Sequence, residues 1–179
     1  MDIIIRPAIP QEAGILTVLA RRSNRFWDYP EEYHNKWDNE LYMDPSHITR
    51  NMVCLAELAK EIIGYFSIVY VRTDSQLGNR FVNRGFWLEN LFVLPEYMGK
   101  GVGSALLHHA NLLCREQGIK KLYVFVEPYA RGFYDRMGGQ FIRQSPTEFI
   151  DRVIPVYSIS TTHRDDIIIA CGRSSALTL

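Results

Sequence analysis

The chain has 179 residues and a mass of 20.8 kDa, a size that fits a single domain. Hydrophobic residues make up 47% and charged residues 22%, so the chain can bury a sizeable core, which excludes a mainly disordered protein. The 20 basic residues balance the 20 acidic ones, and this zero net charge removes the electrostatic argument for a dedicated nucleic-acid-binding or anionic-membrane-binding protein.

The first half of the chain predicts helices followed by antiparallel strands. Asp44-Pro45 has the pattern of an N-cap with proline at the first helical position, and the short polar link 59–61 between two apolar runs is typical of a hairpin. The expected elements are, in chain order, a strand at 3–6, a helix from Pro10 with Ile15, Leu16, Val18 and Leu19 on its apolar side, a second helix within 23–43, a short helix at 44–50, strands at 52–58 and 62–71, a polar loop at 72–85, and a strand at 86–94.

The second half predicts a strand–helix–strand–helix–strand unit that starts from the strand at 86–94. Its expected elements are a helix at 101–117 with Val102, Ala105, Leu106, His109, Leu112 and Leu113 on one face and Gly118 closing it, then a strand at 122–126, a short helix at 129–137, and strands at 140–143 and 153–159. This order predicts a mixed α/β (α+β) fold over residues 1–159, followed by a C-terminal extension or tail at 160–179. In that tail, residues 167–169 either add an edge strand or belong to a loosely held segment.

The cysteines and the termini bear on the compartment. Cys54, Cys114 and Cys171 are far apart, and the sequence has no CxxC or Cys/His cluster, so we expect no metal site and no disulfide framework. The N-terminus reaches Pro7 too soon for a signal peptide, and no apolar run approaches the ~18 residues of a membrane span. The sequence therefore predicts a soluble, cytoplasmic protein with reduced thiols.

The segment 87–103 carries the strongest chemical signal. A strand runs into a loop with glycines at 99, 101 and 103, and an amphipathic helix begins there. Alternate glycines let the backbone approach a ligand, and the free N–H groups of a helix N-terminus bind phosphate. The loop has neither the Walker A spacing nor the dinucleotide-binding fingerprint, so the pattern indicates an anion site of another kind.

Two segments resemble the motifs of a known enzyme family. Leu-Glu-Asn-Leu-Phe-Val at 88–93, Pro95, and Gly-Lys-Gly-Val-Gly at 99–103 are similar to motif A of the GNAT N-acetyltransferases. Glu-Pro-Tyr-Ala-Arg-Gly-Phe-Tyr-Asp-Arg-Met-Gly at 127–138 resembles their motif B. The resemblance follows the element order over residues 2–159 and is specific over 87–139. It implies the GNAT fold, in which helices flank both faces of a mixed central sheet of about six to seven strands.

The resemblance implies acetyl-CoA as co-substrate, held between the strands at 86–94 and 121–126. The pantetheine would pair with backbone groups of Leu91, Phe92 and Val93, where a backbone N–H near Leu91 would also polarise the thioester carbonyl. The diphosphate would sit on the loop that follows. The remaining residues expected at the cofactor are Met98, Gly99, Lys100, Gly101, Val102, Gly103, Ser104 and Tyr129.

Two side chains match the family's catalytic residues. Glu89 matches the strand carboxylate that several members, the polyamine acetyltransferases among them, use as base, directly or through water, because an amine is mostly protonated at neutral pH. Tyr134 matches the tyrosine that protonates the departing thiolate. The chain departs from the family at Met98, where motif A has Arg or Gln, and at Tyr129, where motif B often has Asn.

Each of these residues also has an ordinary structural interpretation. The glycine loop could be a tight turn, Glu89 a solvated or ion-paired strand residue, and Tyr134 a packed ring. His109 is expected in the core, Cys114 is interpreted as a small hydrophobe, and His34, His47, His108 and His163 have no evident partner. The aromatic residues Trp27, Tyr29, Tyr33 and Trp37 either wall a substrate pocket or make core or dimer contacts.

Taken together, the sequence predicts an N-acetyltransferase that moves the acetyl group of acetyl-CoA to a primary amine of a small molecule or peptide. The amine would attack directly in a ternary complex, since no cysteine is placed to carry the acetyl group. The alternative is a catalytically weak acyl-CoA-binding regulatory or scaffold domain. Neither nucleic acid nor membrane is an expected partner, and the resemblance allows a homodimer.

Overall fold

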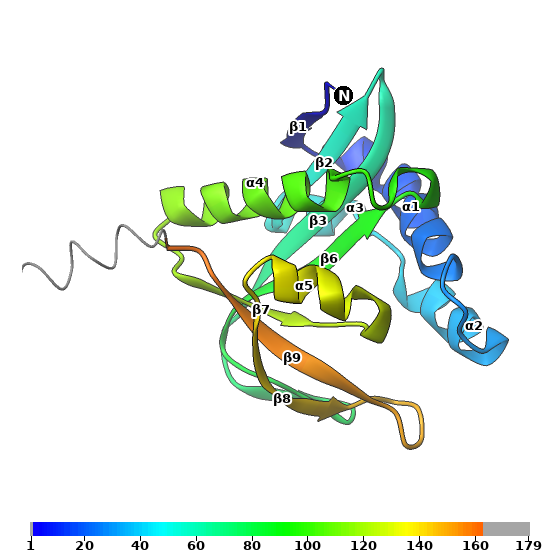
Figure 1. Ribbon diagram of the computed structural model, residues 1–179, viewed down its shortest axis with the longest axis vertical. Helices are drawn as coiled ribbons and strands as arrows, with labels where there is room; N and C mark the ends of the chain where they lie inside the picture. Colours follow the sequence, from blue (N-terminus) through cyan, green and yellow to red (C-terminus); the bar gives the residue numbers. More distant parts are fainter. Residues whose placement is uncertain (1, 163–179) are drawn as a thin grey trace, which may run out of the picture.

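The computed structural model describes residues 2–162, which form a seven-stranded sheet with helices on both faces (Figure 1). The helices are α1 (Ala13–Arg25), α2 (Glu31–Glu40), α3 (Pro45–Arg50), α4 (Val102–Glu116) and α5 (Arg131–Arg136), with short 3-10 turns η1 (Pro10–Glu12), η2 (Pro95–Tyr97) and η3 (Pro128–Ala130). The strands are β1 (Ile4–Pro7), β2 (Met52–Leu58), β3 (Glu61–Val71), β4 (Ser75–Leu77), β5 (Arg80–Val82), β6 (Gly85–Val93), β7 (Lys121–Phe125), β8 (Gln140–Pro146) and β9 (Val153–Ser160).

The main sheet has the strand order β1-β2-β3-β6-β7-β9-β8. Every neighbouring pair is antiparallel except β6 and β7, which run parallel. This parallel pair meets at only two register positions, Phe86 opposite Leu122 and Trp87 opposite Tyr123. The sheet is therefore mixed, as predicted, and its parallel pair opens along most of its length.

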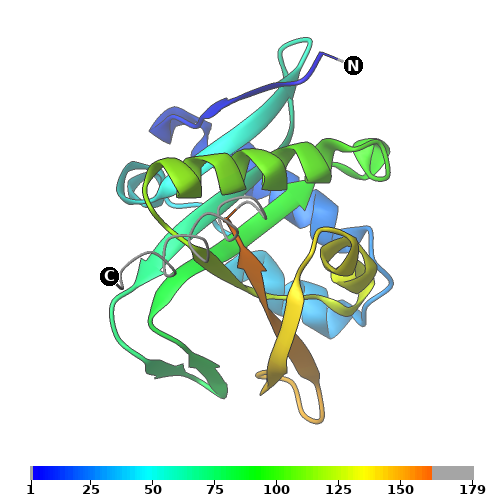
Figure 2. The same ribbon diagram turned by 60° about the vertical axis from the view of Figure 1, so that its left-hand side comes forward.

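Two apolar layers cover the sheet from opposite sides (Figure 2). On one side α4 and α5 pack against a core that includes Phe66, Leu88 and Leu106. On the other side α1 and α3 pack against a second core that includes Leu55 and Tyr65. The sheet separates its two faces. Two ligands bound on opposite faces can therefore come into contact only where neighbouring strands separate.

The short helix α3 forms for a local reason. The side chain of Asp44 accepts a hydrogen bond from the backbone N–H of Ser46 at 2.7 Å, and Pro45 takes the first helical position. Ile48 is 6% exposed and anchors the helix in the second core. The N-cap predicted from Asp44-Pro45 is confirmed, and it sets where the side chain of His47 lies.

The sequence-based boundaries agree with the structure for most elements, but the prediction of a loop at 72–85 is wrong. Strands β4 and β5 pair there as a small antiparallel hairpin, from Ser75 opposite Val82 to Leu77 opposite Arg80. Gly78 turns the chain with φ of +56°, a conformation that favours glycine. The hairpin has too few apolar residues to show the alternation that marks a strand.

The predicted apolar faces of two helices are partly wrong. Ile15 and Val18 are 53% and 56% exposed, because the buried side of α1 follows the three- and four-residue spacing of Ala13, Leu16, Thr17, Ala20 and Ser23. In α4, Leu112 is 39% exposed. The buried residues of α4 are Val102, Leu106, Leu107, Ala110 and Cys114.

The contact of β3 with β6 and α4 requires a glycine at position 64, and this requirement can be tested. A Cβ on Gly64 would lie 2.8 Å from the carbonyl oxygen of Phe92 and 3.0 Å from Cδ1 of Leu106. We expect Gly64→Ala to lower the free energy of unfolding by about 1–3 kcal/mol, measured by urea denaturation. The control is Gly14→Ala, at an open site in α1, which should instead raise it by up to ~1 kcal/mol. Equal effects of the two substitutions would contradict this account.

Candidate active site

The central feature of the site is the opening between β6 and β7. Beyond Trp87 and Tyr123 the two strands no longer pair, while β6 stays paired with β3 up to Val93. The edge of β6 that faces β7 therefore carries unpaired backbone groups, and the segment 91–93 lies at its far end. Backbone N–H and C=O groups need partners, so this edge can bind an extended ligand that has amide groups of its own.

The loop after β6 leads to a helix N-terminus with free backbone donors. Gly99 and Gly101 have φ of +72° and +87°, so glycine is required at both for conformational reasons. The first N–H of this region to bond within α4 is that of Ala105, which donates to the carbonyl of Gly101. The donors that precede it in the loop and have no acceptor among the described residues belong to Gly99, Gly101, Val102, Gly103 and Ser104, whereas the N–H of Lys100 donates to the carbonyl of Tyr97. Free donors at a helix N-terminus favour a negatively charged ligand, which makes this loop the candidate anion site.

The side chains of the loop leave this anion site open. No atom lies within 4 Å of where a Cβ would stand on Gly99 or Gly101. Lys100 is exposed, and its Nζ lies 5.8 Å from the ring centre of Tyr97. Met98 is half-buried. Because the backbone supplies the donors, an apolar side chain at Met98 is compatible with anion binding.

The carboxylate of Glu89 projects from a β-bulge. Ser67 lies opposite Asn90 and the next residue, Ile68, lies opposite Leu88, so Glu89 is the extra residue of β6. A bulge of this kind redirects a side chain out of the regular alternation. Oε2 of Glu89 accepts hydrogen bonds from Oγ of Ser67 and Nδ2 of Asn90, each at 3.2 Å. Its side chain is 43% exposed, so the carboxylate is held in place but remains accessible.

A cavity of about 150 Å³ adjoins Glu89 on the side of α2 and α3. His47, which the sequence leaves without an evident partner, lies there with Nε2 3.1 Å from Oε2 of Glu89. Sequence reasoning missed this contact because 42 residues separate the two side chains in the chain, and only the packing of α3 brings them together. The residues that line the cavity are Glu40, Leu41, Tyr42, Met43, His47, Tyr65, Glu89 and Asn90.

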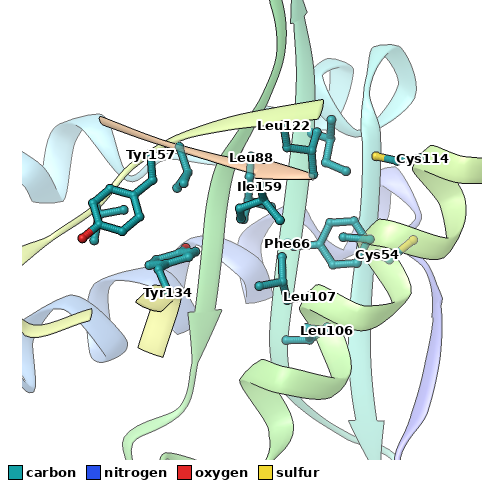
Figure 3. Close-up of a cluster of buried hydrophobic side chains, with 14 of the residues drawn as sticks. Cys54, Phe66, Leu88, Leu106, Leu107, Cys114, Leu122, Tyr134, Tyr157 and Ile159 are labelled. Atoms are coloured by element: carbon teal, nitrogen blue, oxygen red, sulfur yellow. The ribbon is translucent and has the colours of Figure 1, made fainter. Parts of the chain in front are cut away.

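Tyr134 is buried at the end of the first core, where α5 approaches the sheet. Its ring is 6% exposed and lies near Tyr157 and Leu88 (Figure 3). Burial raises the pKa of the Tyr134 phenol well above its usual value, so the hydroxyl keeps its proton at neutral pH. Gly139 permits this packing, because a Cβ there would lie 2.9 Å from both the Tyr134 carbonyl oxygen and the Tyr157 ring.

The aromatic residues of the α1–α2 region pack against other parts of the chain. Trp27 stacks on Tyr129 with ring centres 5.0 Å apart, and the Tyr129 hydroxyl donates to the carbonyl of Asp28 at 3.2 Å. Tyr129 is thus 49% exposed but held by the segment before α2. This contact connects the predicted cofactor residue of η3 with the segment before α2.

The rings of Tyr29, Tyr33, Trp37 and Phe149 surround the guanidinium of Arg152 at 5.0–5.9 Å from their centres. We call this arrangement the Arg152 cage. Glu127 completes it, because its Oε2 accepts hydrogen bonds from Arg152 and from the hydroxyl of Tyr29. Of the two interpretations of these aromatic residues, the structure supports a role in packing, because a cation of the same chain fills the space between the rings.

Cys54, Cys114 and His109 are buried or half-buried side chains that pack in the interior. Cys54 and Cys114 are buried, and burial raises the pKa of both thiols to about 11. Both therefore stay protonated at neutral pH, which makes them poor nucleophiles. His109 is half-buried beside Phe66, with ring centres 6.4 Å apart. Cys171 and the predicted edge strand at 167–169 lie outside the described residues.

Two further observations concern residues 2–162 as a whole. Among them, no three His, Cys, Asp or Glu side chains gather closely enough to hold a metal ion. None of the helices in this part of the chain combines the length and the apolar character that a membrane crossing requires.

Comparisons with known proteins identify the family. The family profile described as "Acetyltransferase (GNAT) family" matches residues 19–139, which is more than half of the chain. The chain therefore belongs to the GNAT family of acetyltransferases. A comparison of the sequence with curated proteins finds no significant match.

Solved structures with the same fold cover nearly the whole chain. A PaiA N-acetyltransferase from Thermoplasma acidophilum, in complex with coenzyme A, is 22% identical with a TM-score of 0.70, over 89% of this chain and 99% of that one. A GCN5-related N-acetyltransferase from Rhodopseudomonas palustris is 18% identical with a TM-score of 0.71, over 89% and 96%. An IAA acetyltransferase from Bacillus cereus is 16% identical with a TM-score of 0.58, over 89% and 99%. At these identities the likeness confirms the GNAT fold.

The Arg152 cage should contribute to stability. Replacing Arg152 by alanine removes a cation that is enclosed by four rings and leaves Glu127 without its ion-pair partner. We expect Arg152→Ala to lower the free energy of unfolding by about 2 kcal/mol, measured by urea denaturation with tryptophan fluorescence. The matched control is Arg131→Ala, whose side chain is 65% exposed and should change stability very little. If the cage contributes nothing to stability, the urea denaturation curves of Arg152→Ala and Arg131→Ala will be indistinguishable.

Proposed function

We propose that the protein transfers the acetyl group of acetyl-CoA to a primary amine in a ternary complex. The observation that carries this proposal is the open edge of β6, which leads directly to the free backbone donors at the N-terminus of α4. An edge that pairs with amides and an adjacent anion site match the two halves of coenzyme A, its pantetheine and its diphosphate. Membership of the GNAT family and the coenzyme A complex of the T. acidophilum relative support the same ligand.

In this proposal the backbone groups of Leu91, Phe92 and Val93 bind the pantetheine. The N–H groups of residues 99–104 bind the diphosphate, and Lys100 adds positive charge at the rim. Tyr129, held by Trp27 in the turn that follows β7, makes a further contact with the cofactor. A backbone N–H near Leu91 donates to the thioester carbonyl and stabilises the negative charge that develops on its oxygen.

The acceptor amine occupies the cavity next to Glu89. Two of the residues that line this cavity, Glu40 and Glu89, are acidic and His47 is the only basic one, which favours a positively charged amine. Glu89 promotes loss of a proton from the ammonium group, directly or through water. The free amine then attacks the thioester carbonyl carbon, so that a C–N bond forms, the C–S bond breaks and the electron pair leaves on sulfur.

Tyr134 acts on the leaving thiolate. An ordinary thiol has a pKa of about 8.5, below that of the buried phenol, so Tyr134 stabilises the thiolate mainly by donating a hydrogen bond. This assistance is useful but small, because a thiolate is already a fair leaving group. The protonated state of Cys54 and Cys114 supports direct transfer without an acetyl-cysteine intermediate.

The alternative function is an acyl-CoA-binding domain with little or no turnover. The two functions are separated by incubating the protein with acetyl-CoA and a panel of mono-, di- and polyamines, amino acids and peptides, while thiol release and product mass are followed. An enzyme releases coenzyme A in proportion to acetylated amine. A binding domain retains acetyl-CoA and shows no amine-dependent release, and that result would contradict the proposal.

The anion site is tested by Gly101→Asp. The new carboxylate would face the diphosphate, and the left-handed backbone at this residue would be strained, so we expect the affinity for coenzyme A to fall at least about 100-fold. Gly118→Asp is the matched control, because Gly118 closes the other end of α4 with a similar φ of +69° and an equally open surrounding. Calorimetric titration should show unchanged affinity for the control. Unchanged affinity of Gly101→Asp would exclude the loop as the phosphate site.

The role of Tyr134 is tested by Tyr134→Phe. Loss of one hydrogen bond to the thiolate should lower kcat about 10-fold and leave the KM for acetyl-CoA unchanged. Tyr70→Phe removes a hydroxyl from an exposed ring elsewhere on the sheet and should leave both constants unchanged. If Tyr134→Phe and Tyr70→Phe turn over at the same rate, Tyr134 has no part in the reaction.

A further inference from the structure

The contact between His47 and Glu89 has features that packing alone does not explain. Nε2 of His47 lies 3.1 Å from Oε2 of Glu89, but the two are not aligned as a hydrogen bond, and this nitrogen is buried with no other partner among the described residues. Buried polar atoms without a hydrogen bond are uncommon and often mark functional sites. In ligand-free structures, catalytic hydrogen bonds are frequently poorly aligned and tighten only when the substrate binds.

The surroundings of the pair set its chemistry. Besides His47, the ionisable groups that line the same cavity are Glu40 at the end of α2, Tyr42 from the segment between α2 and α3, Tyr65 from β3, and Glu89 itself. Burial and the neighbouring Glu89 raise the pKa of Tyr65, so its phenol stays neutral. Two glutamates and no lysine or arginine line the cavity, so its charged side chains favour a cationic acceptor beside His47.

The location of the carboxylate also determines which ring nitrogen is free. Nε2 lies within ion-pair distance of the Glu89 carboxylate, so a hydrogen on Nε2 is the one that this carboxylate accepts when the pair aligns, and the lone pair is then on Nδ1. Ser67 and Asn90 hold the same carboxylate oxygen, so the imidazole rests against an acceptor that is itself fixed. A carboxylate that orients a histidine in this way is a common arrangement for a catalytic base.

We propose that His47 is a catalytic residue that takes the acceptor's proton, and that Glu89 orients its ring and stabilises the resulting imidazolium. This assignment rests on the proposed acetyl transfer, and within it His47 replaces Glu89 as the group that receives the proton. The ammonium group of the acceptor gives one proton to Nδ1, directly or through one water, and the N–H bond electrons remain on the amine nitrogen. After attack and departure of the thiolate, the imidazolium returns its proton to solvent, so each turnover releases amide, coenzyme A and one proton.

The experiment is chemical rescue of His47→Ala by free imidazole. Alanine has a high helix propensity, so the substitution should preserve α3. It leaves a gap beside the cavity, into which imidazole can diffuse. We expect His47→Ala to lower kcat/KM for the amine about 100-fold, and added imidazole to raise its rate about 10-fold. More basic methylimidazoles should rescue better.

The matched control is His108→Ala, which removes an exposed imidazole from α4 and should show neither the loss nor the rescue. Calorimetric titration with coenzyme A should give unchanged affinity for all variants, which verifies that they are folded. The role of His47 would be overturned, and the proposed function kept, if the wild-type protein is active and His47→Ala is equally active. The same conclusion would follow if His47→Ala loses activity that imidazole does not restore. A wild-type protein that binds coenzyme A but acetylates no amine would overturn the proposed function and this assignment with it.

Discussion

The divergence of β6 and β7 is the constraint on which the rest of the site depends. At one end the strands are held by two residue pairs and by aromatic contacts. The ring centre of Trp87 lies 5.1 Å from that of Tyr123 and 4.8 Å from that of Phe125. At the other end β7 continues its pairing with β9 only, so β6 is left with an unpaired edge. Unpaired backbone groups inside a sheet require partners. A ligand with its own amides can supply them, and the adjoining α4 N-terminus adds an anion site.

The β-bulge at Glu89 gives the opening a chemical use. By adding one residue to β6, it presents a carboxylate toward α3 while Leu88 stays in the core beneath α4. The capped helix α3 then brings His47 to that carboxylate, and α5 places the buried phenol of Tyr134 in the core on the opposite face. In the proposed reaction, the groups that act on the amine and on the thiolate thus approach from opposite faces of the sheet.

Local patterns predicted much of this arrangement, and long-range packing determined the rest. The glycines at 99 and 101, the caps at Asp44 and Gly118 and most strand boundaries follow from short-range rules of backbone conformation and periodicity, and they agree with the structure. The bulge, the His47–Glu89 contact and the Arg152 cage depend on residues between 22 and 123 positions apart in the chain. No local pattern encodes such contacts, and the side of α1 or α4 that faces the sheet likewise depends on packing with distant strands.

The most direct test of the account is an amide NMR titration of the protein with coenzyme A. If the open edge of β6 and the loop before α4 form the cofactor site, saturable shifts should concentrate on the amides of residues 91–93 and 99–104. The amides of β1 and β2, at the far edge of the sheet, should remain unchanged. Shifts confined to other surfaces, or no saturable binding at millimolar ligand, would contradict the assignment of the cofactor site.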